Sequence, residues 1–118
     1  EEIERCIIKE KFQGIKFEVA VNARDKRLDL IMKKAEELDI LILHHSWYKT
    51  VNKTPNESNP SDIANLASRF PKVKIIMAHM SGCWVRDILD VKPFSNVYID
   101  TSGSQPLAGV VEYAVEEL

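Results

Sequence analysis

A chain of 118 residues, 45% hydrophobic and 29% charged, has the composition of an ordinary globular protein, and its length fits a single domain over residues 1–118. Its formal net charge of -2 gives no electrostatic reason to expect binding to nucleic acid or to an anionic membrane. No apolar run approaches the length of a membrane span, and the acidic start is unlike a signal peptide, so a cytoplasmic protein is expected. Cys6 and Cys83 lack metal-ligand spacing and are expected to be reduced thiols.

Segments with the period of amphipathic helices alternate along the chain with short, apolar segments typical of strands covered on both faces. The predicted helices comprise residues 1–11, 25–38, 60–70, 83–91 and 107–118. The predicted strands comprise residues 15–19, 40–43, 73–78 and 97–99. Because a helix separates each strand from the next, the pattern predicts an α/β fold with a parallel sheet. A barrel and an open doubly wound sheet both satisfy this pattern.

One predicted connection is longer than the others. Residues 46–59 are polar and turn-forming, and loops of this length in compact domains are usually functional or disordered. Asn59 followed by Pro60 predicts an N-cap and the first position of the next helix, which Pro71 then ends. The sequence therefore predicts a long loop between the second strand and the third helix.

All four predicted strands end in residues that can act as metal ligands or acid–base groups. These residues are Glu18, the pair His44 and His45, His79 and Asp100. In parallel α/β folds, ligands bind beyond the carboxyl ends of the strands, where these side chains would converge. A carboxylate with two imidazoles suits Zn²⁺ and, less selectively, Fe²⁺, Mn²⁺ or Ni²⁺. The pattern predicts a divalent metal site, with Zn²⁺ as the first candidate.

Each candidate residue also has a structural interpretation. A strand-end histidine is commonly a hydrogen-bonded structural residue. Glu18 could pair with a loop lysine or with Lys16, which shares its face of the strand. Asp100 could cap the turn formed by residues 101–103. Trp47 could line a pocket or pack over the rim of a barrel. The residues alone leave these alternatives open.

Four segments, "GIKFE", "LILHHSW", "NPSDIANLASRFPKVKIIMAHMSG" and "NVYIDTSGS", together resemble the amidohydrolase-related family of TIM-barrel metal-dependent hydrolases. They look most like the branch that includes aminocarboxymuconate-semialdehyde decarboxylase. The resemblance extends from the helix before Gly14 to Leu118, and its motifs are specific in combination rather than singly. It implies a partial (β/α)8 TIM barrel, a half-barrel fragment covering roughly the fourth to seventh strand–helix units.

The resemblance implies roles for individual residues. The histidine before Ser46 matches the metal-site histidine of the family's fifth strand, which selects His45 over His44; alternation says only that the two face opposite ways. His79 matches the sixth-strand histidine, which binds the metal or lies beside it. Asp100 matches the seventh-strand aspartate, with a supporting catalytic role.

Three further residues complete the candidate site. Glu18 stands where this branch often has histidine, and it is the candidate third metal ligand because other amidohydrolases use glutamate at this strand. Lys16 and Trp47 are the candidate substrate-binding residues. The family's H-x-H pair from the first strand and aspartate from the eighth are not in this sequence, and a full barrel needs about 250 residues. The chain alone is therefore expected to bind metal weakly at most.

The family implies a hydrolase in which a divalent metal lowers the pKa of its bound water toward ~7. The expected substrate is a small amide, ester, lactone or carboxylate. An inactive fragment or remnant that folds by self-association is the alternative, because an open four-stranded fragment exposes two strand edges and an apolar face. Either way, a homo-oligomer is expected. A doubly wound domain for a phosphorylated ligand lacks both G-x-G-x-x-G and a P-loop.

Overall fold

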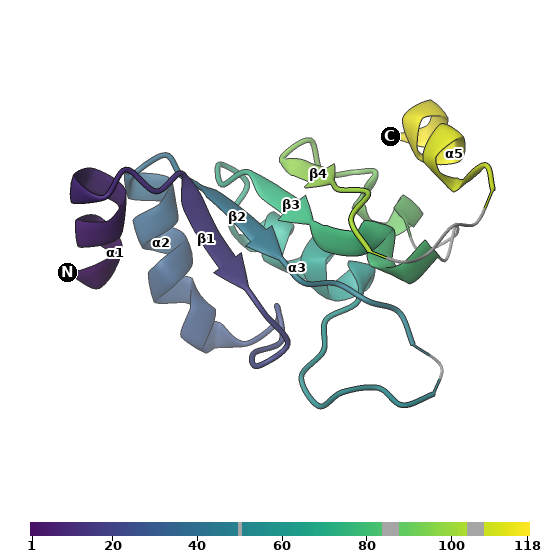
Figure 1. Cartoon of the computed structure of the whole chain (residues 1–118), viewed down its shortest axis with the longest axis horizontal. Coiled ribbons are helices and arrows are strands. Elements are labelled where there is room, and N and C mark those ends of the chain that lie inside the picture. The colour runs from purple at the N-terminus through teal and green to yellow at the C-terminus, as the bar shows by residue number, and fades with distance from the viewer. Residues whose placement is uncertain (50, 84–87, 104–107) are drawn as a thin grey trace.

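The computed structural model describes residues 1–49, 51–83, 88–103 and 108–118, and it contains a four-stranded sheet (Figure 1). All neighbouring strands pair in parallel, in the order β1-β2-β3-β4. The strands are β1 (Gly14–Phe17), β2 (Leu41–His44), β3 (Ile75–Met77) and β4 (Val97–Ile99). All four predicted strands are confirmed, with boundaries that differ by at most two residues. The predicted parallel α/β fold is therefore confirmed.

The helical segments follow the predicted order. Predicted helices near residues 1–11, 25–38, 60–70 and 107–118 are confirmed. The segments are α1 (Glu2–Glu4), a π-helical turn (Arg5–Lys9), a 3-10 turn (Lys26–Leu28), α2 (Asp29–Glu37), α3 (Pro60–Arg69), two 3-10 turns (Ala78–Cys83 and Leu89–Val91) and α5 (Val110–Glu117). Of the predicted helix at 83–91, residues 84–87 lie outside the described residues.

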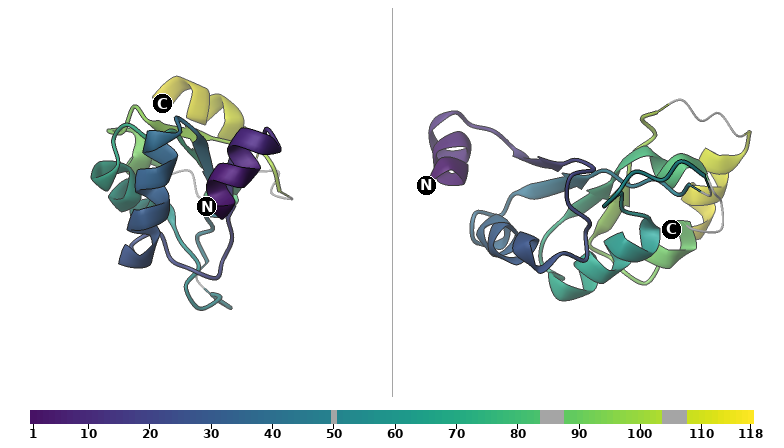
Figure 2. Two further views of the ribbon diagram at one scale, coloured as in Figure 1. Left: turned by 90° about the vertical axis from the view of Figure 1, so that its left-hand side faces the viewer. Right: turned by 90° about the horizontal axis from the view of Figure 1, so that it is seen from below.

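The strand order rules out the doubly wound alternative. In a doubly wound sheet the strand order reverses at a switch point, and helices cover both faces. Here the strand order follows the chain without reversal, and α2 and α3 lie on the same face of the sheet (Figure 2). Right-handed crossovers between successive neighbouring strands place helices on one side in this way. The sheet therefore has the architecture of a barrel segment.

The core lies between the sheet and these two helices. Alternate residues of each strand point toward the helices, because successive side chains of a strand face opposite ways. Burying one such side chain contributes roughly 1.5–3 kcal/mol. The fully buried apolar side chains of this core include Met32, Ile42, Ile63, Leu66, Ile75 and Met77. The continuous apolar runs of the sequence thus supply the layer that holds the strand ends in place.

The other face of the sheet carries a row of side chains in register. Lys16 pairs with Leu43, Leu43 with Ile76, and Ile76 with Tyr98. Tyr98 is 52% exposed, and none of these residues belongs to the core within the described part of the chain. We call this row the open face, because α2 and α3 lie on the opposite side.

The long predicted loop is present, since the described residues between 45 and 59 form no helix or strand. It ends at a capping box that starts α3: the Asn59 side chain accepts from the Asp62 N–H, and the Asp62 carboxylate accepts from the Asn59 N–H. Cys6 is a free thiol, while the Cys83 side chain is outside the described part, so the expectation for the pair stays a prediction. None of the helices in the described ranges has the length and apolarity needed to cross a membrane.

Candidate functional site

His45 and His79 lie side by side at the carboxyl edge of the sheet. Their ring centroids are 5.0 Å apart and their ring planes are inclined by 65°. Adjacent parallel strands bring their carboxyl ends to one rim, which is why residues 34 positions apart meet here. Two imidazoles on one tetrahedral Zn²⁺, with bonds of about 2.1 Å, place their ring centres roughly 5 Å apart. The spacing of the rings fits two ligands of one ion.

The backbone conformation that positions the ring differs between His45 and His79. The His45 N–H donates to the Phe17 carbonyl oxygen at 2.8 Å, which extends the ladder between β1 and β2 by one residue. His79 instead has a φ of 68° and Met80 a φ of 45°. Such left-handed conformations cost non-glycine residues roughly 1–3 kcal/mol each unless the surroundings hold them. Asp100 does so, because its Oδ1 accepts from the His79 N–H at 2.8 Å and its backbone oxygen from the Met80 N–H at 3.1 Å.

Ser102 connects Asp100 to the ring of His79. The Ser102 hydroxyl lies 2.6 Å from Asp100 Oδ1, to which it donates, and 3.0 Å from His79 Nδ1. Because the hydroxyl hydrogen is used on the carboxylate, the hydroxyl oxygen accepts from Nδ1–H of His79. The neutral ring then has its lone pair on Nε2. Asp100 thus reaches the ring only through Ser102, and its catalytic role stays a prediction.

The Asp100 carboxyl also caps the turn after β4, as its structural interpretation expected. Its Oδ1 accepts from the Ser102 N–H at 3.0 Å. Burial raises the pKa of Asp100, but the hydrogen bonds from the Ser102 hydroxyl and from the His79 and Ser102 amides outweigh burial. The net pKa is lower than usual, so the carboxylate is ionised at neutral pH.

Glu57 binds the other histidine, and sequence reasoning missed it. Its Oε1 lies 3.0 Å from His45 Nε2 and 2.9 Å from Lys49 Nζ, and its side chain is 1% exposed. It belongs to the long loop, whose length was the only sequence signal for a functional role here. This contact uses Nε2 of the His45 ring and not Nδ1.

Trp47 packs beside both histidines. Its ring is stacked on His45 at 6.4 Å between centroids and lies 5.6 Å from His79. A Cβ at Gly82, whose φ is +73°, would lie 2.6 Å from Trp47 Nε1, so only glycine leaves the indole this position. Trp47 therefore covers the rim, as one of its interpretations expected, and its contact with a substrate stays a prediction.

His44 faces the helices rather than the rim. It is 0% exposed, its Nδ1 donates to the His45 carbonyl oxygen at 2.7 Å, and its ring meets Phe17 edge-on at 5.4 Å. Its Nε2 atom has no partner among the described residues. Burial lowers the pKa of His44 to about 4, so the ring is neutral at physiological pH. The geometry places His45, rather than His44, beside His79.

The predicted third ligand is not joined to the two histidines. Within the described ranges, no group of three or more histidine, cysteine, aspartate or glutamate side chains could hold a metal ion. Glu18 follows the last residue of β1, beyond the last register pair of the ladder, and its side chain is exposed. Lys16 is also exposed, on the open face. The roles of Glu18 as a ligand and Lys16 in substrate binding remain predictions without support from contacts.

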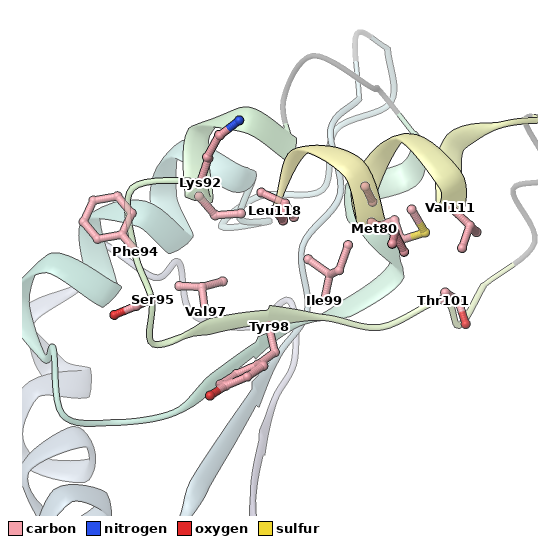
Figure 3. A pocket seen from close by; sticks show the side chains of 13 residues that line it. Met80, Lys92, Phe94, Ser95, Val97, Tyr98, Ile99, Thr101, Val111 and Leu118 are labelled. Carbon is pink, nitrogen blue, oxygen red and sulfur yellow. The ribbon is translucent and has the colours of Figure 1, made fainter.

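A cavity of about 580 Å³ lies away from the histidines, between β4 and α5 (Figure 3). Val97 and Ile99 line it from the strand, Val111 lines it from the helix, and Leu118 lines it from the position directly after the helix. Neither His45 nor His79 lines this apolar cavity, and the sequence did not predict it.

Comparisons with known proteins agree with this architecture. The family model Amidohydro_2, described as amidohydrolase, matches residues 1–116. One similar solved structure is an uncharacterized TIM-barrel protein from Bordetella bronchiseptica, with 18% identity and a TM-score of 0.68 over 81% of this chain and 36% of that one. Another is amidohydrolase 2 from Bifidobacterium longum subsp. infantis, with 15% identity and a TM-score of 0.64 over 89% of this chain and 42% of that one. No curated protein matches the sequence.

The chain spans less than half the length of either solved structure. Together with the four parallel strands in chain order, these likenesses confirm the predicted partial TIM barrel. The family model covers almost all of the sequence. The chain therefore belongs to the amidohydrolase family.

Proposed function

We propose that the chain carries part of the active site of a metal-dependent hydrolase acting on a small amide, ester, lactone or carboxylate. The observation that carries this proposal is the 5.0 Å separation of the His45 and His79 rings at the carboxyl edge of a parallel sheet. Membership of the amidohydrolase family supports the reaction class. The quoted strand-end motifs support the branch that includes aminocarboxymuconate-semialdehyde decarboxylase and a position at roughly the fourth to seventh strand–helix units.

Two ring nitrogens are available to hold a divalent metal. The hydrogen bond to Glu57 leaves Nδ1 of His45, and the one to Ser102 leaves Nε2 of His79. Nitrogen ligands of this kind suit Zn²⁺, which we propose as the metal. Such an ion supplies a bound water whose pKa is near ~7. Glu18 is proposed as a third ligand, which would require its side chain to move toward the pair.

The surrounding residues would prepare this site. Asp100 and Ser102 keep the proton of His79 on Nδ1, so that its Nε2 can bind metal or polarise a substrate carbonyl. Trp47 covers both rings and would exclude water and contact the apolar part of a substrate. Lys16 would attract a substrate carboxylate from the open face.

Titration of the chain with Zn²⁺ by calorimetry tests the metal site. The wild type is expected to bind weakly, and His45→Ala and His79→Ala are each expected to lower the affinity at least tenfold, because each removes one of two nitrogen ligands. His44→Asn is the matched control: it removes a neighbouring imidazole that faces the helices and should leave the isotherm unchanged. Identical isotherms for the wild type and both alanine variants would remove the site.

We also propose that the chain self-associates, which the open face favours. Leu43, Ile76 and Tyr98 present apolar surface there, and β1 and β4 are edge strands with unpaired backbone groups. Light scattering is expected to give a homodimer or a higher oligomer. Ile76→Lys, which places a charge in the middle of this row, is expected to reduce the mass to that of one chain. A folded wild-type monomer at high concentration would contradict the proposal.

A further inference from the structure

The carboxylate of Glu57 is almost fully buried in the long loop, at 1% exposure. A buried charge is costly unless it is paired and hydrogen-bonded. Here Oε1 accepts from His45 Nε2 at 3.0 Å and from Lys49 Nζ at 2.9 Å, while the Thr54 N–H lies 3.3 Å from Oε2. Each oxygen therefore has a donor, and one of the donors is a candidate metal ligand.

The Glu57 carboxylate pairs with the Lys49 ammonium at 2.9 Å, and an ammonium only donates hydrogen bonds. Its other oxygen faces the Thr54 N–H, which is also a donor. A carboxylate paired in this way only accepts hydrogen bonds, so the nitrogen of His45 that faces it must carry a hydrogen. A neutral His45 ring with a proton on Nε2 has its lone pair on Nδ1.

The loop holds Glu57 firmly enough to impose this choice. The Glu57 carbonyl oxygen lies 3.4 Å from Asn22 Nδ2, and the next residue, Ser58, accepts from the Ala23 N–H through its hydroxyl at 2.9 Å. The Ser58 carbonyl oxygen accepts from the Trp47 N–H at 2.8 Å. These bonds tie the loop to the segment after β1 and to the residues next to His45, so the carboxylate is fixed relative to the ring.

We propose that Glu57 is the positioning residue of His45: it keeps the ring proton on Nε2 and fixes the ring orientation, which makes Nδ1 the nitrogen that binds a divalent metal. Carboxylates that accept the second N–H of a ligating histidine orient the ring and raise its basicity. Ser102 fixes His79 in the opposite tautomer, with its lone pair on Nε2. The statement about the tautomer stands alone, whereas the statement about metal rests on the proposed function.

The first test needs only the wild-type chain without metal. Nitrogen-15 NMR of the imidazoles at about pH 8.5, two units above the reference pKa of histidine, reports which ring nitrogen carries the proton. We expect His45 to be protonated on Nε2 alone, with a slowly exchanging Nε2–H signal, and His79 to be protonated on Nδ1. A His45 ring protonated on Nδ1, or a mixture of tautomers, would overturn the proposal.

The second test compares Zn²⁺ affinities of variants. Glu57→Ala is expected to lower the affinity 10- to 100-fold, the range typical of such partners, and to populate both His45 tautomers. Glu57→Gln keeps an acceptor oxygen and should recover most of the affinity together with the Nε2–H tautomer. Lys49→Met is the matched control, because it removes the other partner of Oε1 and leaves the bond to His45.

The outcomes separate this inference from the proposed function. If the wild type binds no Zn²⁺ but His45 is protonated on Nε2 and loses that preference in Glu57→Ala, the metal site fails and the tautomer assignment holds. If Zn²⁺ binds equally to the wild type and Glu57→Ala, the positioning role fails and the metal site holds. If Glu57→Ala does not fold, two other results test the proposal: the His45 tautomer in the wild-type spectrum, and the Zn²⁺ affinities of Glu57→Gln and Lys49→Met. A Zn²⁺ affinity that is lowered in Lys49→Met but not in Glu57→Gln would overturn the proposal.

Discussion

Replacing Asp62 with alanine is expected to lower the free energy of unfolding by about 3 kcal/mol, because three hydrogen-bond donors lose their acceptor. Asp62 is 7% exposed. Its carboxylate accepts from the Asn59 N–H and from Asn22 Nδ2, both at 3.0 Å, and from Arg24 Nε at 2.6 Å. These donors come from the loops after β1 and β2, so Asp62 joins both loops to the start of α3.

Urea denaturation followed by circular dichroism measures this loss. Asp62→Asn keeps one acceptor oxygen and should fall between the wild type and the alanine variant. Arg24→Ala removes only the most exposed of the three donors, whose side chain is 51% accessible, and should cost less than about 1 kcal/mol. An alanine variant at position 62 within about 1 kcal/mol of the wild type would show that the loops are held by other contacts.

Acidification from pH 6.5 toward 4 is expected to lower the free energy of unfolding by about 3 kcal/mol through the protonation of His44 alone. Burial lowers its pKa to about 4 from the model-compound value of 6.5, and its bond to the His45 carbonyl oxygen offsets only part of this effect. The unfolded chain therefore takes up the proton first as the pH falls. The contribution of His44 is complete above pH 6.5 and is lost progressively down to the folded-state pKa.

His44→Asn isolates this effect, since an amide can still donate to the His45 carbonyl oxygen but does not ionise. Urea unfolding at several pH values between 7 and 4.5 should show a steeper loss in the wild type than in the variant. The acidic groups with lowered pKa, Glu57, Asp62 and Asp100, lose their contributions only at lower pH, below their unfolded values. Parallel curves for the two proteins would refute the assignment to His44.

The sequence predicted those parts of the fold that local patterns control. Apolar runs located the strands, because a parallel strand is buried along its whole length. Asn59 and Pro60 located the start of α3, because capping and the missing proline N–H are local effects. The proximity of His45 and His79 followed from parallel strand order, which brings strand ends together whatever the residues between them.

The parts of the site that the sequence did not predict depend on tertiary contacts. Glu57 reaches His45 from a loop that hydrogen bonds to Asn22 and Ala23 hold against the segment after β1, and these partners lie far from it in the sequence. The sequence placed Glu18 on the same face as Lys16, because side chains two residues apart in a strand point the same way. This rule holds only within the strand, and the last residue of β1 that pairs with β2 is Phe17. The left-handed backbone at His79 gave no sequence signal, because the residue is not glycine.

The left-handed backbone at His79 and Met80 makes the orientation of the His79 ring depend on β4, an edge strand of three residues. The N–H groups of both residues donate to Asp100, which directly follows β4, and not to β3. Short edge strands belong to the parts of a protein that fray most easily, with opening free energies far below that of global unfolding. The fraction of molecules in which His79 has the orientation described above therefore depends on how often β4 separates from β3. A ligand or a neighbouring chain that binds along β4 would raise that fraction without contacting the histidine.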